Sequence, residues 1–273
     1  MSARLIATTR AQVSVIEAGA GAPLVYLHGF ADVHACMADL QPFHHALAKK
    51  RRLIAIALPG VNGSEELEDG TGVDDVLFRL LETIDALDLG AFDLVGHCAG
   101  GWFAAELAVR HPDRVKSLTL IGATGLFVSG QLIGDIFMQA QPERGVDYKT
   151  LRAMLFSSAD HPIALEHYPD IRGDIDTEVR RYQMLRFGSF VGFRPPYFYN
   201  RSLIDRLYRA RMPTRVIWGE KDGMVPLAHA EAYAKNLPGA GGKPVIIKGA
   251  GHAVHLEAPE AVAAAIAELL VGA

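Results

Sequence analysis

Residues 93–101 read DLVGHCAGG, and this stretch decides the fold. Its apolar opening predicts a buried strand, and a helical pattern over residues 102–110 follows directly. A strand and a helix joined by so sharp a turn approach each other closely, so small residues are needed around Cys98, and Gly96 and Gly100 meet that need. The turn is therefore expected to lift the Cys98 side chain above the sheet, beside the unpaired amides of a helix N-terminus.

The pattern Gly-x-Cys-x-Gly between a strand and a helix resembles the nucleophile elbow of the α/β-hydrolase fold, with Cys98 in the nucleophile position. The resemblance covers nearly the whole chain. It implies an α/β architecture: a mostly parallel, eight-stranded sheet flanked by helices. It also implies that an acid and then a histidine follow the nucleophile along the chain.

Residues 27–32, LHGFAD, stand at a predicted strand end and resemble the oxyanion loop of this family. By that match, the backbone amides of Phe30 and Ala99 would hold the oxyanion that develops in the transition state. His28 is a candidate substrate-binding residue. A structural role for His28 is the favoured alternative, because the amides carry the oxyanion function.

Residues 218–226, WGEKDGMVP, resemble the acid-bearing turn of the family, and Asp222 takes the acid position, with Glu220 as a rival. Residues 249–252, GAGH, match the histidine loop, so His252 is predicted to be the base that deprotonates Cys98. His255 is the weaker candidate, since it suits the start of the last helix or a packing position under the site.

A thiol in this position suggests a particular chemistry. A free thiol has a pKa near ~8.5, and a histidine partner beside a helix N-terminus can lower it by several units. Dienelactone hydrolases, which this site resembles, use Cys, His and Asp on the same fold. Two alternatives stay open for Cys98, namely a small buried apolar residue and a serine replaced by cysteine. Cys36 lacks an elbow and is predicted to pack in the interior.

Strands and helices alternate along most of the chain, which is typical of a parallel sheet covered on both faces. Residues 5–10 and 12–18 follow one another too closely for a parallel crossover and predict an antiparallel edge pair. Helices are expected over residues 73–87, with Asp74 as the cap, and over 258–270. Further buried strands are predicted at residues 24–27, 53–57, 93–95, 118–121, 214–218 and 244–247.

The α/β-hydrolase core is predicted to comprise residues 1–125 and 212–273, and residues 126–211 a helical cap, or lid, inserted between two strands. The insertion resembles the cap of esterases, epoxide hydrolases and carbon–carbon hydrolases. Eight of the 22 aromatic residues fall between Tyr182 and Tyr208. Packing within the cap explains any one of these aromatic residues as well as a ligand does. The aromatic candidates for substrate binding are Trp102, Phe127, Phe187 and Tyr197.

Composition excludes several classes of partner. The net charge of the 273 residues is -4, and no basic block is present that could bind nucleic acid. No apolar run approaches the ~18 residues needed to cross a bilayer, and no leader pattern opens the chain, so a cytoplasmic protein is expected. His34, Cys36, His44 and His45 lack paired metal-ligand spacings. Neither a metal nor a cofactor is predicted; the expected partner is a small-molecule substrate, and a homo-oligomer is left open.

Together these motifs predict an enzyme, a hydrolase that cleaves an ester, thioester or lactone of a small, mostly apolar substrate through an acyl-enzyme on Cys98. Acyl transfer and carbon–carbon bond cleavage on the same triad are the alternatives, followed by a non-catalytic ligand binder. Dehalogenases and epoxide hydrolases of this fold carry an aspartate at the nucleophile position, so Cys98 argues against both activities.

Overall fold

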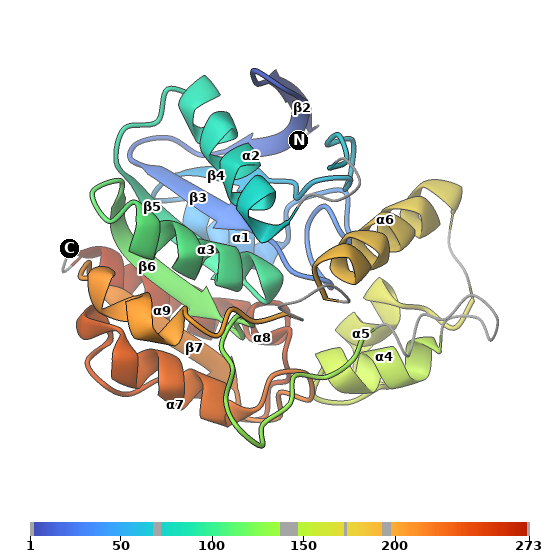
Figure 1. The fold of residues 1–273 in the computed structure, drawn as a ribbon. Coiled ribbons are helices and arrows are strands. Elements are labelled where there is room, and N and C mark those ends of the chain that lie inside the picture. Colours follow the sequence, from blue (N-terminus) through green and yellow to red (C-terminus); the bar gives the residue numbers. More distant parts are fainter. Residues whose placement is uncertain (1–2, 68–71, 137–146, 172–173, 193–197, 272–273) are drawn as a thin grey trace.

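The structure is a computed structural model that describes residues 3–67, 72–136, 147–171, 174–192 and 198–271. Its eight strands form one sheet in the order β1-β2-β4-β3-β5-β6-β7-β8 (Figure 1). β1 and β2 pair antiparallel at one edge, β2 also meets β4 antiparallel, and the other pairs are parallel. The predicted α/β-hydrolase fold and its antiparallel edge are confirmed. The strands are β1 Arg4–Ala7, β2 Gln12–Ala18, β3 Pro23–Leu27, β4 Arg52–Ile56, β5 Phe92–His97, β6 Val115–Ile121, β7 Thr214–Gly219 and β8 Val245–Ile247.

Helices cover both faces of the sheet because side chains alternate along each strand. Val25 and Leu27 of β3 lie in the apolar core that includes helices α2 and α3, whereas Leu24 and Tyr26 lie in the core that includes α1 and α9. Both faces of β3 are therefore buried, as its continuous apolar sequence predicts. The helices of the core are α1 Pro42–Ala48, α2 Val73–Ala86, α3 Ala99–Arg110, α7 Leu227–Asn236, η2 Pro238–Ala240, α8 Val254–Glu257 and α9 Pro259–Val271.

Between β6 and β7 the regular elements of the described residues are helices only. They are α4 Tyr148–Leu155, α5 Pro162–His167, α6 Ile175–Gly192 and the short η1 Ile204–Arg209. Figure 1 shows α4, α5 and α6 grouped at one side of the molecule, beyond the sheet. These helices occupy the segment that the sequence predicts to be the cap.

Two helix starts differ from the sequence expectation. α3 begins at Ala99 and not at Trp102, because the elbow passes into the helix without a linker. Gly72 is the N-cap residue of α2, and the side chain of Asp75 accepts a hydrogen bond from its amide at 2.9 Å. Asp74 is instead the second residue of the helix and forms an ion pair with Arg110 at 2.8 Å.

The parallel strands place their carboxyl ends at one edge of the sheet. Leu27 of β3 pairs with Gly96 of β5, so the loop after β3 and the turn after β5 leave the sheet side by side. Gly219 of β7 likewise pairs with Ile247 of β8. The four predicted site motifs therefore meet at this edge, where open α/β sheets bind their ligands. Among the helices of the described residues, none is both long and apolar enough to cross a membrane.

Candidate active site

Cys98 occupies a strained turn between β5 and α3. Its backbone φ is 54° and ψ is -119°, a conformation that residues other than glycine rarely adopt. The Cys98 amide donates to the Ile121 carbonyl at 3.0 Å, and the Cys98 carbonyl accepts from the Trp102 and Thr124 amides at 3.1 and 3.2 Å. Hydrogen bonds to β6 and to the loop after it thus hold the strained residue in place.

The glycines around Cys98 allow the elbow to form. A Cβ atom on Gly96 would lie 2.3 Å from the Gly100 carbonyl oxygen, and one on Gly100 would lie 2.2 Å from the Leu27 carbonyl oxygen. Real Cβ atoms do not approach so closely, so both positions require glycine. The close approach of strand and helix is the physical reason for the motif.

The loop after β3 packs directly against the elbow. A Cβ atom on Gly29 would lie 2.8 Å from the Cβ atom of Cys98. Phe30, the next residue, is fully buried, as is Ala99 at the start of α3. Among the described residues, neither the Phe30 amide nor the Ala99 amide donates a hydrogen bond, which leaves both amides available beside Cys98.

His252 and Asp222 form a buried pair at the same edge. The imidazole Nδ1 of His252 lies 2.8 Å from Asp222 Oδ2, and the two side chains are fully buried. The amides of Met224 and Val225 donate to Asp222 Oδ1 at 2.9 and 2.7 Å. The carboxylate is therefore fixed by its own turn and holds the imidazole with Nδ1 protonated, so Nε2 carries either a lone pair or a second proton.

Charge stabilises the imidazolium of His252. Burial disfavours the charged ring, but the negative charges of Asp222 and Cys98 outweigh burial and raise the pKa of His252 to about 10. Nε2 of His252 has no hydrogen-bond partner among the described residues. Cys98 Sγ lies 4.0 Å from the thioether sulfur of Met224. Cys98 and His252 are both fully buried, and Cys98 is among the groups that raise the pKa of His252, so the thiol and the imidazole share one buried site.

The rival candidates lie elsewhere. Glu220 is exposed, and its carboxylate accepts from the Gly249 amide at 2.9 Å. His255 is fully buried with its Nε2 3.2 Å from Asp32 Oδ2. Each rival therefore has a partner other than the thiol–imidazole couple, while Asp222 contacts His252 directly.

His28 and Trp102 are both fully buried. His28 Nε2 accepts from the Leu58 amide at 3.0 Å, and its Nδ1 donates to the Gly29 carbonyl at 3.1 Å. Both ring nitrogens are thus occupied by backbone partners, which favours the structural role for His28. Trp102 is the fourth residue of α3, and its indole nitrogen donates a hydrogen bond to Glu106 at 3.3 Å.

Two of the three aromatic candidates in the predicted cap lie within the described residues. Phe187 of α6 is buried, with its ring edge against Phe103 of α3 at 6.1 Å between centroids. Phe127 is partly exposed and its ring lies beside Tyr199. Tyr197 lies outside the described residues. Phe187 therefore packs against the helix that starts at the elbow.

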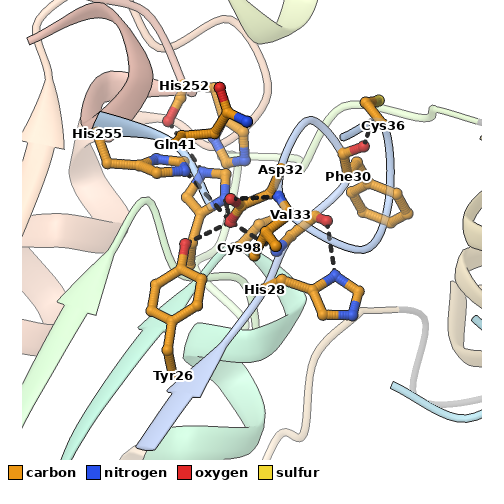
Figure 2. A network of polar contacts seen from close by, with 12 residues as sticks. Tyr26, His28, Phe30, Asp32, Val33, Cys36, Gln41, Cys98, His252 and His255 are labelled. Carbon is orange, nitrogen blue, oxygen red and sulfur yellow. Dashed lines mark hydrogen bonds and ion pairs between the residues drawn. The ribbon is translucent and has the colours of Figure 1, made fainter. Parts of the chain in front are cut away.

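Three further residues at the site were not among the candidates predicted from the sequence. Met224 touches the thiol of Cys98 from the acid-bearing turn. Tyr168, which follows α5, donates its hydroxyl to the Phe30 carbonyl at 2.9 Å. Asp32 forms a buried cluster with several histidines (Figure 2). The available signals were the positions of Asp32 in the oxyanion loop and of Met224 in the acid-bearing turn. Their contacts with His255 and Cys98, and that of Tyr168 with Phe30, join residues that are distant in the sequence.

The sheet order, together with the meeting of these loops at the carboxyl ends of the parallel strands, defines an α/β-hydrolase-type architecture. The chain belongs to the α/β hydrolase fold family, whose sequence profile matches residues 22–259. Among solved structures, that of a bacterial membrane phospholipase A is similar in fold, with a TM-score of 0.79 and 23% identity over 99% of this chain and 86% of that one.

Curated relatives fall into different activity classes. The acetyltransferase component of the acetoin cleaving system of Pseudomonas putida is 29% identical over 89% of this chain and 61% of its own length. The 2-hydroxymuconate semialdehyde hydrolase of Pseudomonas sp. strain CF600 is 38% identical over 40% of this chain and 39% of its own. A monoacylglycerol lipase of Xenopus laevis is 26% identical over 88% and 73%. The chain thus spans about three fifths of the acetyltransferase component that it matches.

Proposed function

We propose that this protein is a hydrolase that cleaves an ester, thioester or lactone of a small, mostly apolar substrate through an acyl-enzyme on Cys98. In this proposal His252 is the general base and acid, Asp222 orients it, and the Phe30 and Ala99 amides stabilise the oxyanion. One observation carries the proposal: a cysteine at a strained elbow shares a buried site with a His252–Asp222 pair joined at 2.8 Å.

Acylation begins from a Cys98 thiolate and a His252 imidazolium, the couple that the raised pKa of His252 favours. The thiolate attacks the carbonyl carbon and forms a carbon–sulfur bond, while the carbonyl π electrons move to oxygen. The resulting oxyanion accepts hydrogen bonds from the backbone amides of Phe30 and Ala99. It then re-forms the carbonyl and expels the alkoxide or thiolate, which takes the proton from His252.

Deacylation uses the same groups in reverse. Neutral His252 removes a proton from water, and the hydroxide attacks the thioester carbon of the acylated Cys98. The second tetrahedral intermediate expels the Cys98 thiolate, and the acid product leaves. Asp222 stays ionised throughout, because its task is to hold the tautomer and stabilise the imidazolium. The cycle consumes one water and leaves the thiolate–imidazolium couple restored.

The surroundings of Cys98 support a mostly apolar substrate. Phe30, Trp102, Phe187 and Met224 are buried near the elbow and the loops beside it. Apolar and aromatic walls with a few placed polar groups are typical of small-molecule sites. The similarity to monoacylglycerol lipases, whose name states ester cleavage, favours the same bond class.

A second candidate is cleavage of a carbon–carbon bond on the same residues. It is favoured by one finding, the 38% identity to a 2-hydroxymuconate semialdehyde hydrolase over 111 residues. A third candidate is acyl transfer to an acceptor other than water, because one of the relatives is an acetyltransferase component. In every case the history of Cys98, native thiol or replaced serine, affects the rate more than the bond class.

The test is a panel of chromogenic esters, thioesters and lactones with a ring-opened dienoic semialdehyde, measured on the protein, Cys98→Ala and Cys98→Ser. The proposal expects turnover of the ester class and its loss in Cys98→Ala. Full activity in Cys98→Ala would remove Cys98 as the nucleophile. Faster turnover by Cys98→Ser would identify the site as one built for serine, and turnover of the semialdehyde alone would support the second candidate.

A further inference from the structure

A buried carboxylate lies beside the candidate active site but outside the predicted triad. Asp32 is fully buried in the oxyanion loop. Its Oδ1 accepts from the Val33 amide at 2.7 Å and faces His44 Nε2 at 3.4 Å. His44 Nδ1 accepts from the Gln41 amide at 3.1 Å, so the neutral His44 ring carries its proton on Nε2, facing Asp32. Oδ1 of Asp32 therefore accepts a hydrogen bond from the Val33 amide and lies close to the His44 ring.

The other oxygen of Asp32 reaches three more elements. The Tyr26 hydroxyl donates to Oδ2, the Gly29 amide approaches it at 3.5 Å, and His255 Nε2 lies 3.2 Å away. Figure 2 shows these contacts converging on Asp32 from separate parts of the chain. Burial disfavours the charged carboxyl, but His255 and His44 outweigh it and hold the pKa of Asp32 well below its usual range. Asp32 is thus a buried anion stabilised by hydrogen bonds from Tyr26 and Val33 and by the nearby His255 and His44.

The residues around Asp32 belong to the loops that carry the predicted chemistry. Gly29 precedes Phe30, the predicted oxyanion donor, and His255 follows His252 by three residues. His97 directly precedes Cys98, and its Nδ1 lies 3.7 Å from Asp32 Oδ2. On the other side of its ring, His97 Nε2 donates to the His252 carbonyl at 3.2 Å. The Asp32 carboxylate therefore hydrogen-bonds within the oxyanion loop and lies 3.2 Å from His255 and 3.7 Å from His97. The His97 ring in turn bonds the His252 carbonyl, so Asp32 lies against residues next to all three loops.

We propose that Asp32 is a positioning residue whose carboxylate fixes the spacing of the three loops that carry Phe30, Cys98 and His252. The role rests on the proposed function, because it acts through those groups and does not touch the substrate. Its physical basis is that a buried anion tolerates little change in the geometry of its donors. Small displacements of reacting groups reduce rates strongly, so the effect is expected in kcat.

A metal ion is the competing explanation for the cluster. Ligand atoms of Asp32, His97 and His255 all lie within 4.8 Å of one another. Hydrogen bonds already use both oxygens of Asp32, because Oδ2 accepts from the Tyr26 hydroxyl and Oδ1 accepts from the Val33 amide. Metal analysis separates the two explanations. A stoichiometric divalent metal in the purified protein, lost in Asp32→Asn, would overturn the hydrogen-bonded arrangement.

The test compares Asp32→Asn with Asp93→Asn. Asp93 is also buried and hydrogen-bonded, to Arg51 at 2.9 Å and Ser117 at 2.7 Å, but it stands at the opposite end of β5 from Cys98. Asp32→Asn is expected to lower kcat on an activated ester on the order of 100-fold with KM within about threefold. Asp93→Asn is expected to lower Tm while kcat stays within about threefold. Equal kcat losses in both variants would overturn the positioning role.

A second pair of variants decides the question if Asp32→Asn does not fold. Gln at position 255 can place an amide donor near the His255 Nε2 position, whereas Leu only fills space. His255→Gln is expected to keep most of kcat and His255→Leu to lose it. Equal kcat in the two variants would contradict a hydrogen-bonded role for Asp32 and indicate packing alone.

Failure of this inference is distinguishable from failure of the proposed function. If the unmodified protein forms no acyl adduct on Cys98, the proposed function fails. If it forms the adduct and His255→Leu and Asp32→Asn form it at the same rate, only the positioning role of Asp32 is refuted.

Discussion

The Nδ1 atom of His252 lies 2.8 Å from Oδ2 of Asp222, with both side chains fully buried. Two residues 30 positions apart are joined here because the loops after β7 and β8 leave neighbouring parallel strands. The contact fixes which nitrogen of the imidazole can face Cys98.

Asp222→Asn should abolish most of the activity with little loss of fold. The amide cannot stabilise the imidazolium and favours the wrong tautomer, so kcat is expected to fall on the order of 1,000-fold or more. Glu220→Gln is the matched control, since Glu220 stands two residues away and is exposed. Steady-state kinetics on both variants check the assignment. A larger loss in Glu220→Gln would transfer the acid role to that residue.

The stability of the protein should depend on pH through His252. Its pKa is raised from 6.5 to about 10 in the folded protein, chiefly because the charges of Asp222 and Cys98 outweigh burial. A raised folded-state pKa contributes stability that is fully present below pH 6.5 and is lost as the pH rises to about 10. Urea unfolding across this window should show a decline that His252→Gln reduces. An identical pH dependence in the variant would contradict the raised pKa.

Gly100→Ala should destabilise the fold. The added Cβ atom would lie 2.2 Å from the Leu27 carbonyl oxygen, so β3 and α3 must move apart. A loss of at least about 2 kcal/mol in the free energy of unfolding is expected. Gly90→Ala is the control, because its Cβ atom would meet nothing within 4 Å. Similar denaturation midpoints for the two variants would show that the elbow is looser than described.

Tyr168→Phe should weaken the oxyanion loop without unfolding the segment between β6 and β7. It removes the 2.9 Å hydrogen bond to the Phe30 carbonyl, a contact worth about 1 kcal/mol. A several-fold fall in kcat is expected, with KM largely kept. Tyr148→Phe makes the same change at a hydroxyl that bonds Glu178 at 2.9 Å instead. If both variants match the unmodified protein in kcat, the Tyr168 contact has no part in catalysis.

The sequence predicted the fold well because its decisive signals are local. The strand, the turn around Cys98 and the following helix occupy consecutive residues, and the glycines at 96 and 100 report a close approach that only glycine permits. The close spacing of the first two strands likewise excluded a parallel crossover and predicted the antiparallel edge. Helix starts were less accurate, since Gly72, without a capping side chain, is the N-cap of α2.

The surroundings of the candidate site could not be predicted in the same way. Asp32, His97 and His255 are far apart in the sequence, and their convergence depends on side-chain directions that no spacing encodes. The contact of Met224 with the thiol and of Tyr168 with Phe30 also arises only in the folded chain. Motifs therefore indicated which groups could react, while the groups that hold them became visible only in three dimensions.

The proposal that Cys98 is the nucleophile is tested most directly by brief reaction of the protein with an activated ester. The intact mass is then measured, and the modified residue is located by peptide mapping. We expect one added acyl group on the peptide that contains Cys98, and no adduct in Cys98→Ala. Cys36 is the internal control, because it is buried and its pKa is raised to about 11. An acyl group on Cys36 or on any other residue, or an adduct that persists in Cys98→Ala, would contradict the account.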